Sequence, residues 1–483
     1  MSVNLSKSVF SGVFWKFSER ILAQLISFVV SIVIARILTP EDYGLVAMGM
    51  IFINIANVFV SNGFSAALIQ KKDSDDLDFS TLFYCSLAIS IILYILIYLI
   101  APLLAKFYEN EFLIKLVRVF GFILPLSAYK SIQSAYVSKT LDFKKFFFST
   151  LAGTIVSAFV GIFMALKGWG VWALVAQYFT NNIIDSLVLT FTIKWKPKLI
   201  FSLKKSFPLL SYGAKVLGAD LIGTIYNQLN AFLIGKKYTT SNLAYYTKGK
   251  QFPDLISNNI CSSLSAVLFP AFSIKSDDKA EMKRMCRKTI SMASFILLPL
   301  YFGLIAVSTN LVKVLLTDKW ISCVPFLIIM CINGIIGTLD IVDIQMLKAL
   351  GRSDTVLKME FVKKPLYIII TIIALRFNLI ILAFTLPVSS VIAIVINSFY
   401  VNKYIGYSLW RKIKDSVKSF VAAFIMGIVV YLMNYININQ IFLLFLQIMT
   451  GVITFVLLSY ILRNKNMNYC INLLRGNKIA VNN

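Results

Sequence analysis

Charged and amide side chains interrupt an apolar stretch near the start of the chain, at residues 11–37. If this stretch is helical, Lys16, Arg20 and Gln24 share one face with two serines, in a stripe about 80° wide. Arg20 would then lie roughly 13 Å into a bilayer that the helix crossed. Charge at that depth is costly and usually marks a functional cavity, so this face predicts a binding surface. The alternative is that Lys16 snorkels to the membrane interface and the amides only hold helices together.

Similar polar stripes recur at helical spacing in other apolar stretches. Asn54 and Asn57 lie three residues apart in the next stretch, and Asp220 begins a stripe about 100° wide in a later one. Neighbouring helices with polar faces predict a hydrated cavity between them. The predicted substrate-binding residues are Lys16, Arg20, Gln24, Asn54, Asn57, Asp220, Thr224, Asn227, Gln228, Gln251 and Asp254.

Asp185 is the candidate for ion coupling. It follows Gln177 and Asn181 at four-residue spacing, which places a carboxylate among amides inside an apolar helix. Such a group can exchange a proton or hold sodium, and a hydrogen-bonded structural aspartate is the alternative. Other charged residues fall near the ends of apolar stretches and are predicted to be interfacial: Asp340, Asp343, Lys363 and Lys364.

Several kinds of catalytic and metal chemistry are excluded by residue type. The chain has no histidine, which removes His-ligated metals, Ser-His-Asp triads and imidazole proton relays. Its six cysteines form no CxxC pair and are expected to be free thiols. No nucleophile-base pair, metal cluster or nucleotide-binding loop is found. We therefore expect a transporter that is not an enzyme and that needs no cofactor or metal, coupled if at all to a proton or sodium gradient.

Composition identifies the chain as an integral membrane protein. Of its 483 residues 58% are hydrophobic, and the mean hydropathy is +0.80. Apolar runs long enough to cross a bilayer as helices recur along the whole chain, which predicts an all-α polytopic fold with about fourteen transmembrane helices. The predicted spans are 11–37, 43–65, 79–105, 112–136, 146–167, 170–193, 207–235, 243–272, 288–311, 321–347, 356–376, 378–402, 415–436 and 440–462.

The formal net charge of +25 comes from basic residues that gather in alternate loops. They cluster near residues 71–72, 139–145, 194–205 and 275–288, and again in alternate connections further on, whereas the intervening loops hold far fewer. By the positive-inside rule both termini are predicted to be cytoplasmic. These charges are explained by topology and by contact with anionic lipid, so no nucleic-acid partner is expected.

The first two spans repeat about 200 residues later, an offset read directly from the sequence. Ile34 and Thr39 match Ile234 and Thr239, and the intervening turn, 35–44, contains Asp42 or Glu41 to start the second helix. An even number of spans in each copy predicts two parallel six-helix repeats forming N- and C-lobes, followed by two extra C-terminal helices. The predicted domains are 1–198 (helices 1–6), 199–408 (helices 7–12) and 409–483 (helices 13–14 with a cytoplasmic tail).

The order of these segments resembles the polysaccharide transporter family within the multidrug/oligosaccharidyl-lipid/polysaccharide exporter superfamily. The resemblance covers nearly the whole chain, and its order and spacing are more specific than any single motif. The residues that carry it are Trp15 with Arg20 and Gln24, the turn 35–44, the run 63–70, Gln133 with 141–143, 170–175, Trp195 with Pro197, 233–235, Phe269-Pro270 and 349–352.

The resemblance implies a flippase that moves undecaprenyl-pyrophosphate-linked oligosaccharide across the bacterial cytoplasmic membrane by alternating access, for O-antigen, capsule or exopolysaccharide synthesis. It also implies a polysaccharide polymerase and a chain-length regulator as partners. The cationic face on 11–37 agrees, because Arg and Lys bind pyrophosphate oxygens strongly. Three alternatives stay open: a multidrug or cation antiporter of the same superfamily, a lipid II flippase, and a membrane glycosyltransferase or polymerase, for which no external loop is long enough.

Overall fold

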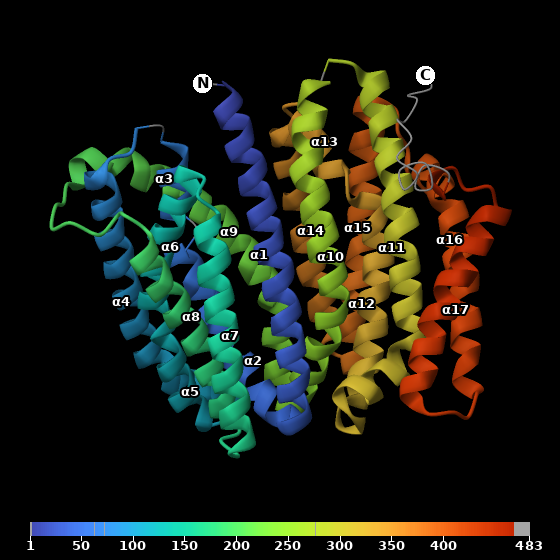
Figure 1. Cartoon of the computed structure of the whole chain (residues 1–483), viewed down its shortest axis with the longest axis horizontal. Coiled ribbons are helices and arrows are strands. Elements are labelled where there is room, and N and C mark those ends of the chain that lie inside the picture. The colour runs from blue at the N-terminus through green and yellow to red at the C-terminus, as the bar shows by residue number, and fades with distance from the viewer. Residues whose placement is uncertain (1, 62, 72, 276, 468–483) are drawn as a thin grey trace. The chain divides into compact units, whose positions relative to one another are not determined.

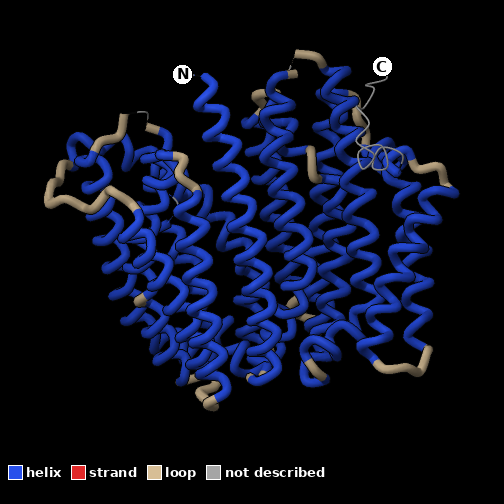
Figure 2. The backbone as a smooth tube through the Cα atoms, in the orientation of Figure 1, coloured by secondary structure: helices blue, strands red, loops and turns tan. Residues whose placement is uncertain are grey.

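The computed structural model describes residues 2–61, 63–71, 73–275 and 277–467, and in this part of the chain helices joined by loops make up the fold, without a strand (Figures 1 and 2). The predicted all-α fold is therefore confirmed. The α-helices of the first half are α1 (Ser2–Ile37), α2 (Pro40–Ser61), α3 (Gly63–Gln70), α4 (Asp76–Tyr108), α5 (Phe112–Gly121), α6 (Ile123–Thr140), α7 (Lys144–Leu166), α8 (Val171–Thr192) and α9 (Leu203–Lys237).

The second half continues the pattern with long helices and short 3₁₀ turns. Its elements are α10 (Thr240–Ile274), α11 (Lys279–Leu316), η1 (Asp318–Cys323), α12 (Val324–Gly337), η2 (Thr338–Asp340), α13 (Asp343–Ala349), α14 (Ser353–Ala374), α15 (Leu379–Ile405), α16 (Leu409–Leu432), η3 (Met433–Tyr435) and α17 (Gln440–Ile461). The tail beyond residue 467, which includes Cys470, lies outside the described residues.

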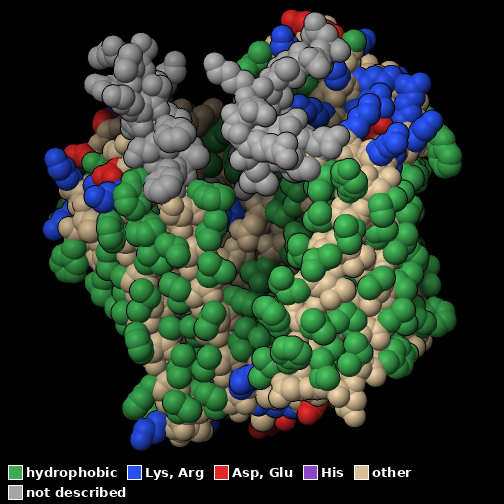
Figure 3. Space-filling model, turned by 45° about the vertical axis from the view of Figure 1, so that its right-hand side comes forward, with side chains coloured by type: hydrophobic (Ala, Val, Ile, Leu, Met, Phe, Trp, Pro, Cys, Tyr) green, Lys and Arg blue, Asp and Glu red, His purple; other side chains and the backbone are tan. Residues whose placement is uncertain are grey.

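Each predicted span overlaps a helix of the structure. Within the described residues, 10 helical stretches are long and apolar enough to cross a membrane. Helices α8, α9, α10 and α14 occupy predicted positions but are not among the ten, so the number fourteen stays a prediction. Figure 3 shows hydrophobic side chains over the middle of the visible surface and Lys and Arg side chains gathered toward the helix ends, as a membrane-spanning protein requires.

The internal repeat is visible in the helix ends. Helix α1 ends at Ile37 and α9 ends at Lys237, and the next helices start at Pro40 and Thr240. At the first start, the Thr39 hydroxyl donates to the Asp42 carboxylate (2.7 Å) and accepts from the Asp42 backbone N–H (3.2 Å). At the second start, the Thr239 hydroxyl accepts from the Asn242 backbone N–H (3.2 Å). Both copies therefore begin their second helix with the same cap, as predicted for Asp42.

The chain folds into two compact units, Met1–Ala244 and Tyr245–Asn483. Helix α9 opens the second repeat in sequence, yet it packs in the first unit against α2, α3 and α4. The compact units thus divide the chain later than the predicted repeat boundary at residue 198. The three predicted domains follow repeats and not compactness, and they stay a prediction.

The segment between the two repeats, residues 193–202, and the start of α9 contact the first turn of α4 through two ion pairs. Asp75 caps α4, and its carboxylate also pairs with Lys205 at 2.5 Å, while Lys198 pairs with Asp76 at 2.5 Å. The hydrogen bond from Lys205, together with a backbone hydrogen bond from Asp78, lowers the pKa of Asp75 to about 2. Beneath these pairs, Trp195 packs in an aromatic cluster with Phe79. The segment that precedes α9 therefore has fixed contacts in the first unit.

Candidate functional site

The predicted polar face of α1 is partly exposed: Lys16 and Arg20 are exposed and Gln24 is half-buried. Helix α1 packs beside α7, and Trp15 contacts Phe147 edge-on at 5.0 Å between ring centroids. Lys16 pairs with Glu19 at 2.7 Å and lies over the Phe146 ring at 4.5 Å, and its side chain remains 50% exposed. Arg20 is exposed too, one turn further on. The cations that suggested an anionic ligand are therefore accessible on this helix.

Helix α2 carries the two predicted amides, both half-buried. The side-chain carbonyl oxygen of Asn57 is buried and has no hydrogen-bond partner in the described part of the chain. A buried acceptor without a donor costs about 1–3 kcal/mol, so it is rarely left in a purely structural position. Its neighbour Ser61 continues the polar track, since the Ser61 backbone carbonyl accepts from the hydroxyls of Ser65 and Ser131, each at 2.7 Å.

Helix α9 is held against the first unit by close backbone approaches. A Cβ atom on Gly63 would lie 2.5 Å from the Gly213 carbonyl oxygen, and one on Gly235 would lie 2.9 Å from the Tyr108 ring. The Tyr108 hydroxyl also donates to the Phe232 carbonyl oxygen at 3.4 Å. Glycine is needed here because no side chain fits between the helices.

These contacts position the predicted cavity residues of α9. Asp220, Thr224 and Gln228 are half-buried and Asn227 is exposed. Arg20 and Asp220 occupy equivalent positions in the two repeats, from which we predict that they pair when the cavity is empty. Both belong to the first compact unit, and the pairing itself stays a prediction. The remaining predicted residues, Gln251 and Asp254, are half-buried on α10 in the second unit. That they share one cavity with the α1 face also stays a prediction.

Asp185 has a partner that the sequence did not reveal. It is 3% exposed on α8, and its carboxylate pairs with Lys130 of α6 at 2.6 Å. One turn away, Gln133 of α6 donates to the Thr190 hydroxyl of α8 at 2.7 Å. Lys130 and Gln133 are three residues apart, which places both on one face of a helix. This spacing is the feature of the sequence from which a polar contact between α6 and α8 could have been predicted. An ion bound by Asp185 would have to compete with the Lys130 ammonium group.

A second buried network joins three helices of the second unit. Lys412 of α16 is fully buried, pairs with Asp343 of α13, and donates to the Ser398 hydroxyl of α15 at 2.9 Å. The Asp343 side chain is buried within the helix packing, and its expected position near the membrane interface stays a prediction. Sequence reasoning missed Lys412, which lies within a basic stretch that reads as a topology signal.

The network extends to the neighbouring turn of α15. Asn397 donates to both carboxylate oxygens of Asp340, at 2.9 and 2.8 Å, and accepts from Lys363 of α14 at 3.2 Å. Lys363 is 4% exposed and also pairs with Glu360 at 2.6 Å, and its expected interfacial position stays a prediction. Lys364 lies beside the same carboxylate at 3.8 Å.

The two networks occupy corresponding places in the repeats. Lys130 and Gln133 precede Asp185 in the first unit, much as Asp340 and Asp343 precede Asn397 in the second. In both units the polar bonds join the corresponding helices, α6 to α8 and the η2–α13 segment to α15. Helix α16 lies outside the repeat and adds Lys412 to the second network. Each unit therefore contains ionic and hydrogen-bonded contacts that join helices distant in the sequence.

The described residues contain no group of three or more Asp, Glu or Cys side chains that could hold a metal ion. The described cysteines are free, as expected. Within the first unit the described residues include the cations of α1, amides on α2 and α9 and the Lys130–Asp185 ion pair. The second unit has its own ionic network around Asp343 and Lys412.

The helical architecture is that of a polytopic membrane protein. It matches the lipid II flippase MurJ in an inward closed conformation with a TM-score of 0.73 and 18% identity, over 93% of this chain and 98% of that one. It also matches an inward-facing multidrug resistance MATE family transporter of the MOP superfamily with a TM-score of 0.61 and 14% identity, over 79% and 94% of the two chains. At these identities the likeness shows the fold.

The chain belongs to the polysaccharide biosynthesis protein family, whose model matches residues 33–325. It is 24% identical to the teichuronic acid biosynthesis protein TuaB of Bacillus subtilis, over 89% of each chain. It is 24% identical to the lipopolysaccharide biosynthesis protein WzxC of Escherichia coli, over 76% of this chain and 75% of that one. A third relative is the succinoglycan biosynthesis transport protein ExoT of Rhizobium meliloti, 22% identical over 72% and 70%. The family recognised from the motifs is confirmed.

Proposed function

We propose that this protein is a flippase for undecaprenyl-pyrophosphate-linked oligosaccharide in polysaccharide synthesis. The observation that carries the proposal is a family match over residues 33–325 in a chain with a membrane transporter fold. Relatives of the chain are named as polysaccharide transport or biosynthesis proteins, which supports a lipid-linked glycan as the substrate.

The exposed cations of α1 support an anionic head on that substrate. Lys16 and Arg20 lie one turn apart on an accessible face, where they can form charge-assisted hydrogen bonds to pyrophosphate oxygens. The orphaned Asn57 oxygen and the amides of α9 supply acceptors and donors suited to sugar hydroxyls. An alternating-access cycle would expose this surface to one leaflet and then the other.

The test is flipping by the purified protein. Proteoliposomes that carry fluorescent undecaprenyl-pyrophosphate oligosaccharide should expose the label to a membrane-impermeant quencher faster than protein-free liposomes do. The glycan should be recovered unchanged in length by mass spectrometry. Extension or cleavage of the glycan, or no acceleration by active protein, would refute the proposal.

A lipid II flippase is the second candidate, favoured by the structural match to MurJ. The same liposomes loaded with labelled lipid II separate the two, because the proposed protein should prefer the polysaccharide precursor. A multidrug antiporter would instead transport cationic dyes, which the cationic α1 face disfavours.

The remaining parts of the proposal concern location, partners and energy. We place the protein in the bacterial cytoplasmic membrane with both termini in the cytoplasm, since the basic loops alternate along the chain. A polysaccharide polymerase would use the exported precursor, under a chain-length regulator. Coupling to a proton or sodium gradient through Asp185 would require the ion to displace Lys130, which gives that step a defined competitor.

A further inference from the structure

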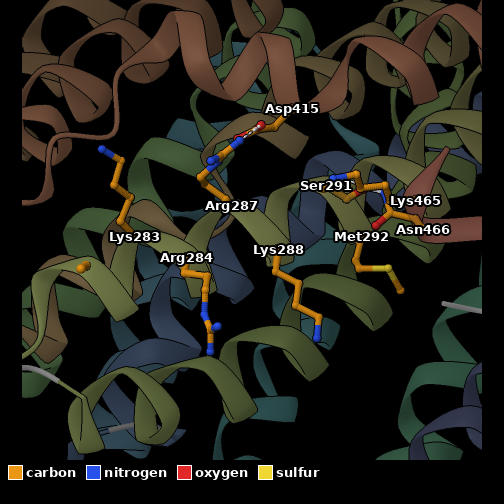
Figure 4. A pocket seen from close by; sticks show the side chains of 10 residues that line it. Lys283, Arg284, Arg287, Lys288, Ser291, Met292, Asp415, Lys465 and Asn466 are labelled. Carbon is orange, nitrogen blue, oxygen red and sulfur yellow. Dashed lines mark hydrogen bonds and ion pairs between the residues drawn. The ribbon is translucent and has the colours of Figure 1, made fainter. Parts of the chain in front are cut away.

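A basic pocket of about 560 Å³ lies in the second unit, and its lining includes none of the residues predicted to bind substrate (Figure 4). One wall is the first part of α11, and the others come from α16 and from the segment after α17. Five basic side chains line it against one carboxylate, that of Asp415. The basic residues are Lys283, Arg284, Arg287, Lys288 and Lys465.

The acidic groups near the pocket are already satisfied. Asp415 accepts two hydrogen bonds from Arg287, at 2.9 and 2.7 Å, and a third from the Tyr407 hydroxyl at 3.0 Å. Glu281 pairs with Arg284 at 2.9 Å. Figure 4 shows Arg287 reaching toward Asp415, whereas Arg284 and Lys288 point away from that carboxylate. The pocket therefore keeps an excess of positive charge.

The wall opposite α11 is held in place by hydrogen bonds from buried side chains. The buried Asn466 side chain donates to the backbone carbonyl and the hydroxyl of Ser291, at 3.0 and 2.7 Å. The buried Asn464 side chain donates to the Ser419 hydroxyl of α16 at 3.0 Å. These bonds fix the segment that carries Lys465 beside α11, so Lys465 and the α11 cations are held around one space.

Apolar surface continues directly from the basic residues. Lys288, Met292, Ile296 and Leu300 follow one another at four-residue spacing and share a face of α11. Met292 lines the pocket, and Ile296 and Leu300 are each 44% exposed. A soluble anion would use only the cations, whereas a lipid would place its phosphate among them and its acyl chain along this face.

We propose that this pocket binds the phosphate headgroup of an anionic glycerophospholipid and that the bound lipid stabilises the second unit. The basic lining supplies the headgroup site, and the α11 face supplies the apolar track. The lipid clamps α11 to the segment after α17, because its headgroup contacts cations on both.

The test compares purified full-length protein in nanodiscs of phosphatidylcholine alone and of phosphatidylcholine with phosphatidylglycerol. Wild-type protein should melt at a higher temperature with phosphatidylglycerol and retain it in native mass spectrometry. The double variant Lys288→Gln/Lys465→Gln should lose most of that increase, with affinity falling about fivefold for each cation removed. Equal melting of variant and wild type in phosphatidylcholine would show that the variant is folded.

Two control variants and one soluble ligand test whether the effect depends on the charge of this pocket and on a lipid. Lys358→Gln/Lys403→Gln removes two exposed lysines of the same unit outside the pocket and should keep the lipid effect. Lys288→Arg/Lys465→Arg preserves charge and should keep it as well. Equal loss in the pocket and control variants would overturn the proposal. Equal stabilisation by inorganic pyrophosphate in phosphatidylcholine nanodiscs would also overturn it, because the site would then recognise a soluble anion.

Discussion

A buried lysine pairs with a buried carboxylate in the second unit. Lys412 and Asp343 are both fully buried, so removing one leaves the other charged and without its counter-ion. We expect Lys412→Met to lower the free energy of unfolding by about 3–5 kcal/mol. Lys412→Met/Asp343→Leu should recover most of that loss, because it removes both charges. The measurement is unfolding in detergent, with the exposed Lys414→Met as the control.

Arg20 is the residue on which the proposed substrate contact depends most. Arg20→Ala should abolish flipping in proteoliposomes, and Arg20→Lys should retain part of it, since lysine keeps the charge and loses the planar fork. Lys115→Ala, which removes an exposed cation from α5 of the same unit, should flip normally. Near-normal flipping by Arg20→Ala would remove the residue from the substrate site.

Variants of Asp185 can separate ion coupling of transport from protein stability. Because Asp185 pairs with Lys130, the stability effect of losing the ion pair can be measured with a double variant. Asp185→Asn should slow transport and flatten its dependence on pH or sodium, if the carboxylate exchanges an ion. Lys130→Met/Asp185→Leu removes the ion pair and should restore stability but not coupling. Full transport with an unchanged ion dependence in Asp185→Asn would assign this aspartate a structural role.

At the scale of helices, the placement of α9 depends on how closely it approaches α3. A Cβ atom on Gly213 would meet the Gly63 carbonyl oxygen at 3.0 Å. Gly213→Val should therefore push the helices apart and cost about 1–3 kcal/mol of stability.

The same helix offers a matched control for that prediction. Gly223 has open space around its Cβ position, so Gly223→Ala should be neutral or stabilising by up to about 1 kcal/mol. Thermal unfolding in detergent measures both variants. A Gly213→Val protein as stable as wild type would show that α9 is not fixed by this contact.

For the whole molecule, the alternation of basic loops predicts which ends face the cytoplasm. We expect Lys196→Cys, in the loop between repeats, to react with an impermeant maleimide only after cells are permeabilised. Asn437→Cys, in the connection before α17, should react in intact cells whose outer barrier has been opened. Both positions are exposed in the structure. The reversed pattern would invert the topology and place the termini outside.

Local composition determined the secondary structure and the class of this protein. Runs of about twenty apolar residues can satisfy their backbone only as helices in a membrane, so the helices and their order could be predicted. The cap at Thr39 and its copy at Thr239 are also local, which is why the repeat could be found by spacing alone. The family resemblance followed from the same ordered segments.

Tertiary structure alone decided which charged residues meet. Lys130 lies 55 positions before Asp185 in the sequence, and Asp343 lies 69 positions before Lys412, separations at which no local pattern specifies contact. The packing of α9 in the first unit could not be predicted from the sequence either. Gly63 and Gly213 come into contact only when the backbones of two distant helices approach each other. Polar spacing along a helix identifies a face, but helix packing determines whether that face meets a counter-ion, a neighbouring backbone or open space.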